Sequence, residues 1–209
     1  EICACLVGSE MCIRDRSYLF DIYLSKVSAQ RNFLTFAVYS TMFPYTSAGP
    51  IVRYTDIETQ LKQRTINISK FGIGAELFVK GLAKKVLLAD NLSVLYSSIC
   101  GHPQMSVFTS WLGILAYTMQ LYFDFSGYSD MAIGLGKMLG FDFNKNFDYP
   151  YISTSVSEFW RRWHISLGSW FRDYIYIPLG GNRVSTLKHI RNILSLIHIS
   201  EPTRHAQIS

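Results

Sequence analysis

A long stretch without charged side chains constrains this chain more than any other feature of its sequence. The run from Asn91 to Phe123 contains no Asp, Glu, Lys or Arg and only one histidine, His102. A second run, from Phe33 to Val52, is also uncharged. Since about twenty apolar residues suffice for a helix to cross the hydrocarbon core of a bilayer, both runs predict membrane-spanning helices. Buried helices of a soluble α-protein remain the alternative, above all for 33–52, where Pro44 interrupts the pattern.

The overall composition lies between that of a soluble protein and that of a transport-type membrane protein. Hydrophobic residues make up 49% of the chain, charged residues 17% and aromatic residues 15%, and the mean hydropathy is +0.14. The net charge is +5, but no basic run indicates a nucleic-acid partner. The basic residues cluster near the ends of apolar segments instead, as anchors at a membrane surface do. We therefore expect an all-α, polytopic membrane helical bundle with interfacial or re-entrant helices.

Helical periodicity organises the middle of the chain. The clearest span is 104–123, set off by a break at Gly101-His102-Pro103, and the helical pattern continues over 124–141. The amphipathic stretch 71–91 suits an interfacial or re-entrant helix. Four glycines in the continuation favour close helix packing over a phosphate-binding loop, because no strand precedes them. They are Gly127, Gly134, Gly136 and Gly140.

Both ends of the chain depart abruptly from this pattern. The first sixteen residues, EICACLVGSEMCIRDR, and the last fifteen, SLIHISEPTRHAQIS, resemble translated read-through of sequencing adapters. We therefore expect non-native tails at 1–16 and 195–209 around a native segment at 17–194. The cysteines of the first tail show no metal-type spacing, so they predict neither zinc nor disulfides. Residues expected to carry no function are Cys3, Cys5, Cys12, His198 and His205.

A single histidine, His164, lies at the centre of an aromatic segment, 120–183, that also holds charged side chains in apolar surroundings. Polar groups in such a setting are costly unless they are paired, so they usually mark a site or a buried network. Ser155 and Glu158 form an S-x-x-E capping box, which predicts the start of a helix. Continued helical spacing would place four side chains on one stripe: Trp160, His164, Leu167 and Phe171.

Two interpretations of His164 stay open from the residues alone. It is either a core histidine bonded to a backbone carbonyl or an acid or base with a pKa suited to proton transfer. An acyl transfer fits the setting, because a base could take a proton from an alcohol while nearby donors stabilise the oxyanion of a thioester. Neighbouring arginines could attract a phosphorylated donor such as coenzyme A.

Other classes of protein compete with this hypothesis. Asp124, Asp130 and Arg161 could form the charged pathway of a non-catalytic membrane transporter or scaffold. A soluble helical enzyme is a third possibility. Paired-cysteine, GxSxG and phosphate-loop motifs are absent, and no pattern predicts a metal site or a bound cofactor.

Long motifs connect the chain to a known family. QLYFDFSGYSDMAIGLGKMLGF and NFDYPYISTSVSEFWRRWHISLGSWFRDYIYIPLGGNR resemble the signature region of the membrane-bound O-acyltransferases (MBOAT), most closely the alginate O-acetyltransferase branch. NFLTFAVYSTMFPYTSAGPIVRYTDIETQL is similar to an upstream part of the same branch. The similarity extends over roughly 17–192.

The resemblance implies roles for particular residues. His164 would be catalytic, as one of the family's two characteristic histidines, beside residues that line a substrate tunnel and bind the donor. These are Glu158, Trp160, Arg161, Arg162 and Trp163, followed by Arg172, Asp173 and Tyr174. Residues of an adjoining helix would support the tunnel: Tyr122, Asp124, Ser126 and Asp130.

The resemblance also implies an activity and a location. An acyl group, expected to be acetyl, would pass from a cytoplasmic thioester such as acetyl-CoA to an exported, alginate-like polysaccharide or to a periplasmic acetyltransferase partner. The protein would be a multi-pass component of the bacterial inner membrane. The family's second histidine, usually assigned as the base, would follow residue 192, where the sequence has turned into the foreign-looking tail. We therefore expect these 209 residues by themselves to be inactive.

Overall fold

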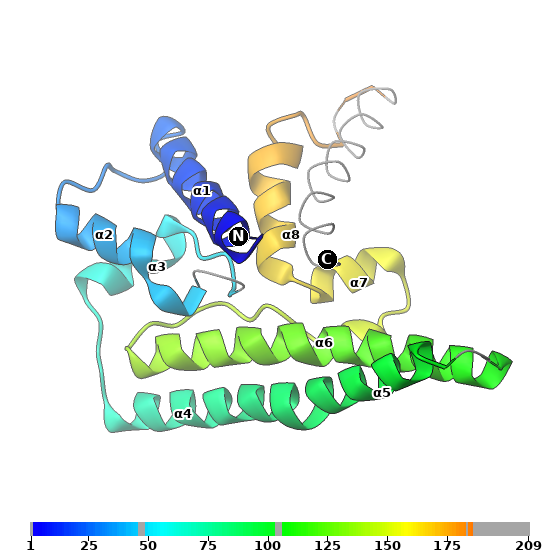
Figure 1. The fold of residues 1–209 in the computed structure, drawn as a ribbon. Helices are drawn as coiled ribbons and strands as arrows, with labels where there is room; N and C mark the ends of the chain where they lie inside the picture. Colours follow the sequence, from blue (N-terminus) through cyan, green and yellow to red (C-terminus); the bar gives the residue numbers. More distant parts are fainter. Residues whose placement is uncertain (1, 46–48, 103–105, 183, 186–209) are drawn as a thin grey trace. The chain divides into compact units, whose positions relative to one another are not determined.

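The all-α class is confirmed in the part of the chain that the structure describes. The computed structural model describes residues 2–45, 49–102, 106–182, 184 and 185, which form helices and connecting segments without a β-strand (Figure 1). The chain divides into two compact units, Glu1–Gln63 with Asn144–Ser209, and Arg64–Phe143. Arg183 and the expected tail at 195–209 lie outside the described residues, as do the side chains of Cys3, Cys5 and Cys12.

The unit Arg64–Phe143 consists of long helices. Helix α4 (Ile68–Ala83) continues through a π-helical segment (Lys84–Ala89) into α5 (Asp90–Cys100), and α6 (Val107–Met138) returns alongside (Figure 1). Ser106 caps α6, because its side chain accepts a hydrogen bond from the Thr109 amide while the Thr109 hydroxyl accepts one from the Ser106 amide. The predicted helix over 104–123 with its continuation is thus confirmed as one helix of 32 residues.

Pairs of glycines allow α4 and α6 to approach closely. Gly74 faces Gly134, and Gly81 faces Gly127, so that backbone meets backbone at both points. A Cβ atom added at Gly134 would lie 2.7 Å from the carbonyl oxygen of Gly74. The predicted role in close helix packing is therefore confirmed for Gly127 and Gly134, since no larger residue fits this seam without moving the helices apart.

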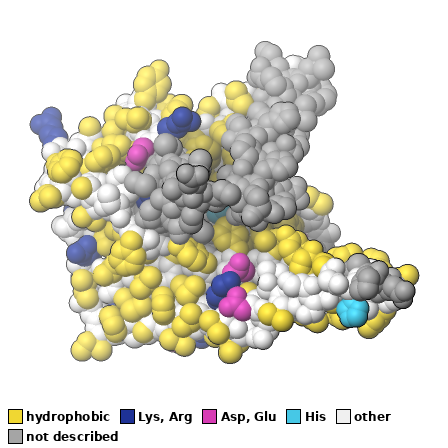
Figure 2. Space-filling view, viewed as in Figure 1, with side chains coloured by type: hydrophobic (Ala, Val, Ile, Leu, Met, Phe, Trp, Pro, Cys, Tyr) yellow, Lys and Arg dark blue, Asp and Glu magenta, His cyan; other side chains and the backbone are white. Residues whose placement is uncertain are grey.

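Apolar side chains of this unit are exposed to an unusual degree. The apolar stripe of the amphipathic stretch 71–91 is largely exposed, with Phe71 53% and Val86 49% exposed, because the glycine side of α4 is the one that packs. Figure 2 shows hydrophobic side chains spread over the face formed by α4 to α6. Within the described ranges, no helix combines the length and apolar character needed to cross a membrane.

The other unit combines helices from both ends of the chain. Helices α1 (Ile2–Tyr23), α2 (Phe33–Thr41) and α3 (Tyr54–Lys62) come from its first part. Its second part supplies α7 (Val156–Arg162) and α8 (Ile165–Phe171), and a π-helical segment (Arg172–Tyr176) extends α8. Short 3₁₀ turns lie at Phe43–Tyr45 and Pro150–Ile152.

Three tyrosines form the packed centre of α1, α2 and α3. The ring centroids of Tyr18 and Tyr54 lie 4.9 Å apart, and those of Tyr39 and Tyr54 lie 5.3 Å apart, both edge to face. Gln30 satisfies two of the hydroxyls, because its backbone amide donates to Tyr18 and its side-chain amide donates to Tyr54. The aromatic cluster fixes the three helices against one another.

The prediction of a single span over 33–52 is wrong. Helix α2 has nine residues and ends at Thr41, and Met42 is already extended. Pro44 has no backbone donor for the α-helical ladder and its ring would clash with the carbonyl four residues earlier, which explains the early end. The segment then runs into the 3₁₀ turn instead of continuing as a helix.

Two glycine-to-alanine substitutions should change stability in opposite directions. Gly134→Ala should destabilise the protein by about 1–3 kcal/mol, because the new methyl group meets the backbone of α4. Gly72→Ala should stabilise it by about 0.5–1 kcal/mol, because the site is open and alanine favours a helix. Thermal unfolding followed by circular dichroism measures both, and a stabilising Gly134→Ala would contradict the seam.

Candidate active site

His164 lies at a break between two short helices. Helix α7 ends at Arg162 and α8 begins at Ile165, and His164 itself adopts the left-handed conformation, with φ 45° and ψ 55°. A non-glycine residue is strained there by about 1–3 kcal/mol, so neighbouring interactions must hold it. The predicted helix start at Ser155 is confirmed, but the prediction of one continuous stripe through Trp160, His164 and Phe171 is wrong.

The segment just before α7 stabilises the break through its backbone. The amide of Asp148 donates to the carbonyl of Arg162 at 2.9 Å, and the amide of Ile165 donates to the carbonyl of Asn146 at 2.9 Å. The ends of α7 and α8 thereby gain partners that a continuous helix would have supplied internally. These bonds come from residues distant in sequence, which the local pattern does not contain.

The side chain of Asn146 lies at the centre of the break. Its Oδ1 accepts hydrogen bonds from the amide and the hydroxyl of Ser166, at 3.1 and 2.9 Å, and lies 3.1 Å from Nδ1 of His164. The Ser166 hydroxyl in turn accepts a hydrogen bond from the amide of Ile51 at 3.0 Å. Asn146 therefore acts as the N-terminal cap of α8 from a distant part of the chain.

The imidazole of His164 is in surroundings that favour its neutral form. Phe147 stacks against it with ring centroids 6.3 Å apart, and Trp163 contacts Phe147 edge to face at 5.1 Å. The side chain keeps some accessible surface, yet protein surrounds the ring, and burial lowers the pKa of His164 to about 4. The imidazole is therefore uncharged at neutral pH and able to accept a proton.

The predicted tunnel residues of α7 divide into paired and open side chains. Glu158 accepts a hydrogen bond from Nε of Arg162 at 3.0 Å, and Arg162 also donates to the Asp148 carbonyl at 3.3 Å. Trp160, 59% exposed, and Arg161 point to the surface of their unit. Separately, Trp163 stacks on Phe159 with ring centroids 5.6 Å apart. Glu158 and Arg162 thus stabilise the helix beside His164.

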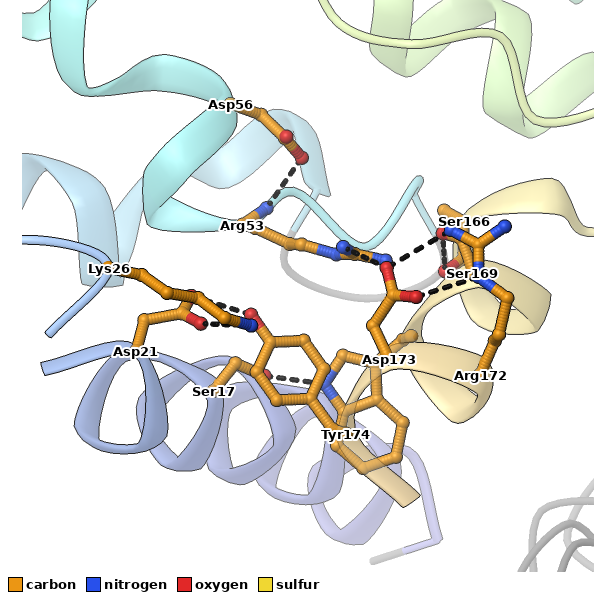
Figure 3. A network of polar contacts seen from close by, with 11 residues as sticks. Ser17, Asp21, Lys26, Arg53, Asp56, Ser166, Ser169, Arg172, Asp173 and Tyr174 are labelled. Carbon is orange, nitrogen blue, oxygen red and sulfur yellow. Dashed lines mark hydrogen bonds and ion pairs between the residues drawn. The ribbon is translucent and has the colours of Figure 1, made fainter. Parts of the chain in front are cut away.

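The residues predicted to bind the donor belong to a polar network (Figure 3). Asp173 accepts hydrogen bonds from Arg172 and from Arg53, each at 2.7 Å. The two guanidinium groups, that of Arg172 first, lower the pKa of the Asp173 carboxyl. Arg53 comes from the loop before α3, so this ion pair joins segments 120 residues apart in sequence.

The same network reaches α1. The Tyr174 hydroxyl donates to Asp21 at 2.6 Å, and the indole N–H of Trp170 donates to the hydroxyl of Ser17. Burial, followed by the hydrogen bond to Asp21, raises the pKa of Tyr174. Lys26 lies 3.5 Å from Asp21 and stacks over the Tyr174 ring (Figure 3). Tyr174 is therefore held in place by α1 and by the segment that follows it.

The predicted supporting residues belong to α6 in the other unit. Asp124 forms an ion pair with Lys85 at 2.8 Å, and Asp130 forms one with Lys84 at 2.6 Å. Ser126 is fully buried, and Tyr122 contacts the ring of Phe123. The two aspartates thus pair α6 with the π-helical segment of the same unit.

Residues that the sequence patterns did not single out complete the candidate site. Asn146 and Ser166 surround Nδ1 of His164, and Asp21 anchors Tyr174. The Asn-Phe-Asp-Tyr-Pro run near Asn146 is the nearest available signal, because Asn and Asp often bond backbone groups in turns. Across the described ranges, no group of three His, Cys, Asp or Glu side chains could hold a metal ion.

The fold and site define a helical protein with a partly buried, uncharged imidazole at a helix break. A model of the membrane-bound O-acyltransferase family (MBOAT) matches residues 9–197. The chain therefore belongs to the membrane-bound O-acyltransferase family.

The names of three relatives refer to acyl transfer to different polymers. The chain is 51% identical over 177 residues to the "probable alginate O-acetylase AlgI" of Pseudomonas fluorescens, covering 85% of this chain and 36% of the relative. It is 40% identical to the peptidoglycan O-acetyltransferase of Helicobacter pylori, in a match that covers 78% of this chain and 32% of the relative. It is 34% identical to the teichoic acid D-alanyltransferase of Bacillus subtilis, in a match that covers 65% of this chain and 35% of the relative. The chain thus spans about a third of the length of these relatives.

Breaking the Arg53–Asp173 ion pair should destabilise the unit that contains His164. Asp173→Asn removes the negative charge that Arg53 and Arg172 share. We expect the free energy of unfolding to fall by about 1–3 kcal/mol. Glu76→Gln is the matched control, because the Glu76–Lys80 pair is exposed and should contribute nothing measurable. Chemical denaturation measures both variants, and equal small effects would contradict a structural role for Asp173.

The stability of the folded protein should depend on the protonation of His164. Its folded pKa of about 4 lies below the ordinary 6.5, so the unfolded chain binds the proton more readily between these values. The stabilisation is complete above pH 6.5 and is lost as the pH falls toward 4. His164→Asn should lack this loss, and asparagine tolerates the left-handed backbone. Thermal unfolding at several pH values tests this, and parallel curves for both proteins would contradict it.

Proposed function

We propose that this chain is part of a bacterial membrane O-acyltransferase that acetylates an exported polysaccharide of the alginate type. The family membership and the 51% identity to a relative named for alginate O-acetylation support the reaction and the acceptor. The observation that carries the proposal is the partly buried, neutral imidazole of His164, held at a strained helix break. Strain of this kind is maintained by its surroundings and is typical of functional sites.

The proposed reaction forms an ester and breaks a thioester. The hydroxyl oxygen of the acceptor bonds to the carbonyl carbon of the acyl donor, and the hydroxyl proton passes to a histidine base. The carbon–sulfur bond then breaks, and the thiolate leaves and takes up a proton. Neutral imidazole accepts a proton or a hydrogen bond in this step, which general base catalysis requires. With a pKa of about 4, His164 suits a supporting role beside a more basic second histidine.

The donor is proposed to be acetyl-CoA or another acyl thioester from the cytoplasm. Arg161 and Arg172 are exposed on the unit that holds His164, and guanidinium groups bind phosphate oxygens through paired hydrogen bonds. Arg172 is already oriented by Asp173 at 2.7 Å. An oriented arginine loses less freedom on binding a phosphate, which supports a position at the donor entrance.

The protein is proposed to be a multi-pass component of the inner membrane. The exposed apolar side chains of α4 to α6 support this location, because surfaces of this extent rarely face water in a soluble monomer. A bilayer would cover them. The acceptor would then be reached on the outer side, either as the polysaccharide itself or through a periplasmic acetyltransferase partner.

The chain is further proposed to be one part of a longer enzyme, with its native segment at 17–194. Its coverage of about a third of its relatives supports this proposal. The second histidine would be supplied by the part of the enzyme that follows.

A substitution in the intact gene product tests the assignment of His164. His164→Ala should abolish O-acetyl ester formation on the exported polysaccharide while the protein still requires detergent for extraction from membranes. Lys80→Gln, at an exposed surface position, is the control and should retain full acetylation. Retained acetylation in His164→Ala would remove this residue from the mechanism.

Thiol release from membranes that contain the protein distinguishes an enzyme from a transporter. An acyltransferase releases free coenzyme A thiol when acetyl-CoA is added, and release should depend on His164. A transporter or scaffold built around Asp124 and Asp130 would move a substrate without consuming the thioester. Flux without thiol release would therefore overturn the enzymatic proposal.

A further inference from the structure

Asn146 is a buried residue whose side chain contacts the imidazole of His164 directly. Only 1% of its surface is exposed, and its Oδ1 is the meeting point of three polar groups. The backbone carbonyl of the same residue also accepts a hydrogen bond from Ile165. Asn146 therefore holds both the backbone and the ring of the strained residue.

The orientation of the Asn146 amide follows from its partners. The backbone amide of Ser166 is a permanent donor and points at Oδ1 from 3.1 Å. Exchanging the oxygen and nitrogen of the side chain would place an NH₂ group against that N–H and lose the hydrogen bond. The atom that faces His164 is therefore an oxygen.

The oxygen determines which nitrogen of His164 carries the proton. A carbonyl oxygen only accepts hydrogen bonds, so Nδ1 of His164, at 3.1 Å, must be the donor. The Ser166 hydroxyl does not compete, because it lies 3.5 Å from Nδ1 and donates to Oδ1 at 2.9 Å. The neutral ring thus carries hydrogen on Nδ1, and the basic lone pair is on Nε2.

We propose that Asn146 is a positioning residue for catalysis, which fixes His164 in the Nδ1–H tautomer and presents Nε2 as an acceptor of a hydrogen bond or a proton. The inference rests on the proposed function only for its catalytic meaning. The tautomer itself is a property of the folded protein and can be measured without any activity.

An amide serves this purpose better than a carboxylate would. The Nδ2 group of Asn146 is buried and has no hydrogen-bond partner among the described residues, which is unfavourable for a polar group. An aspartate would avoid that unpaired donor and still accept all three contacts. However, its negative charge would favour the imidazolium ion, so the neutral amide keeps the ring uncharged.

Most charged groups on the described segments around the site are paired, whereas Arg161 on α7 is exposed. Arg162 pairs with Glu158 and lies near Asp148, and Arg53 pairs with Asp173. Burial is the cause that lowers the pKa of His164. A new charge at position 146 should therefore have a clear effect.

The tautomer is tested by ¹⁵N NMR of the full-length protein labelled at histidine, with His164→Gln used to assign the signal. The wild type should show protonated Nδ1 and unprotonated Nε2 at neutral pH. Asn146→Ala should lose this pattern. Ser166→Ala should keep it, because this change weakens the same cap but leaves the contact between Asn146 Oδ1 and His164 Nδ1 in place. A wild-type ring protonated on Nε2, or an unchanged pattern in Asn146→Ala, would overturn the inference.

Asn146→Asp keeps the test decisive if the alanine variant fails to fold. The aspartate should preserve the tautomer and raise the titration midpoint of His164 by about one pH unit or more. The acid limb of the pH–rate profile for acetyl transfer should move upward by the same amount. An unmoved midpoint in the folded variant would show that position 146 acts only on structure and would refute the proposal.

The two proposals can fail separately. The expected tautomer without any acetyl transfer would support the role of Asn146 in fixing the ring and refute the proposed reaction. Acetyl transfer that depends on His164, together with an unaffected tautomer and pH profile in the Asn146 variants, would refute the positioning role and leave the reaction standing.

Discussion

The hydrogen bonds that Asn146–Asp148 make across the break between α7 and α8 hold the candidate site together. Two backbone bonds and the side chain of Asn146 satisfy groups that the interrupted helix leaves open. The strained conformation of His164 persists only because these bonds favour it. Every chemical property assigned to the imidazole, from its tautomer to its depressed pKa, depends on this docking of one segment against the start of a helix.

Charges in apolar surroundings are stabilised here by pairing within each unit. Asp173 has two arginines, Asp21 has a tyrosine and a lysine, and Asp130 has a lysine. The physical expectation that such groups need partners was therefore correct. Asp124 and Asp130 likewise pair α6 with the π-helical segment of the same unit.

Sequence reasoning succeeded where the information is local. The helix 107–138 and the close packing at Gly127 and Gly134 follow from periodicity and residue size, and the S-x-x-E pattern located the start of α7. It failed where distant residues decide. Helical spacing through His164 continued without interruption, because nothing local reveals that Asn146 caps a new helix there. The 33–52 run looked like a span because lack of charge does not prevent proline from ending a helix.

The contacts of Asp21 with Tyr174 and of Arg53 with Asp173 have a consequence for how the chain is made. Asp21 meets Tyr174 across 153 residues of sequence, and Arg53 meets Asp173 across 120. At translation rates of about 5–20 residues per second, the early helices wait on the order of ten seconds for their partners. During that interval α1 to α3 can form their own tyrosine cluster, whereas the contacts to Asp173 and Tyr174 must wait for the later part of the chain.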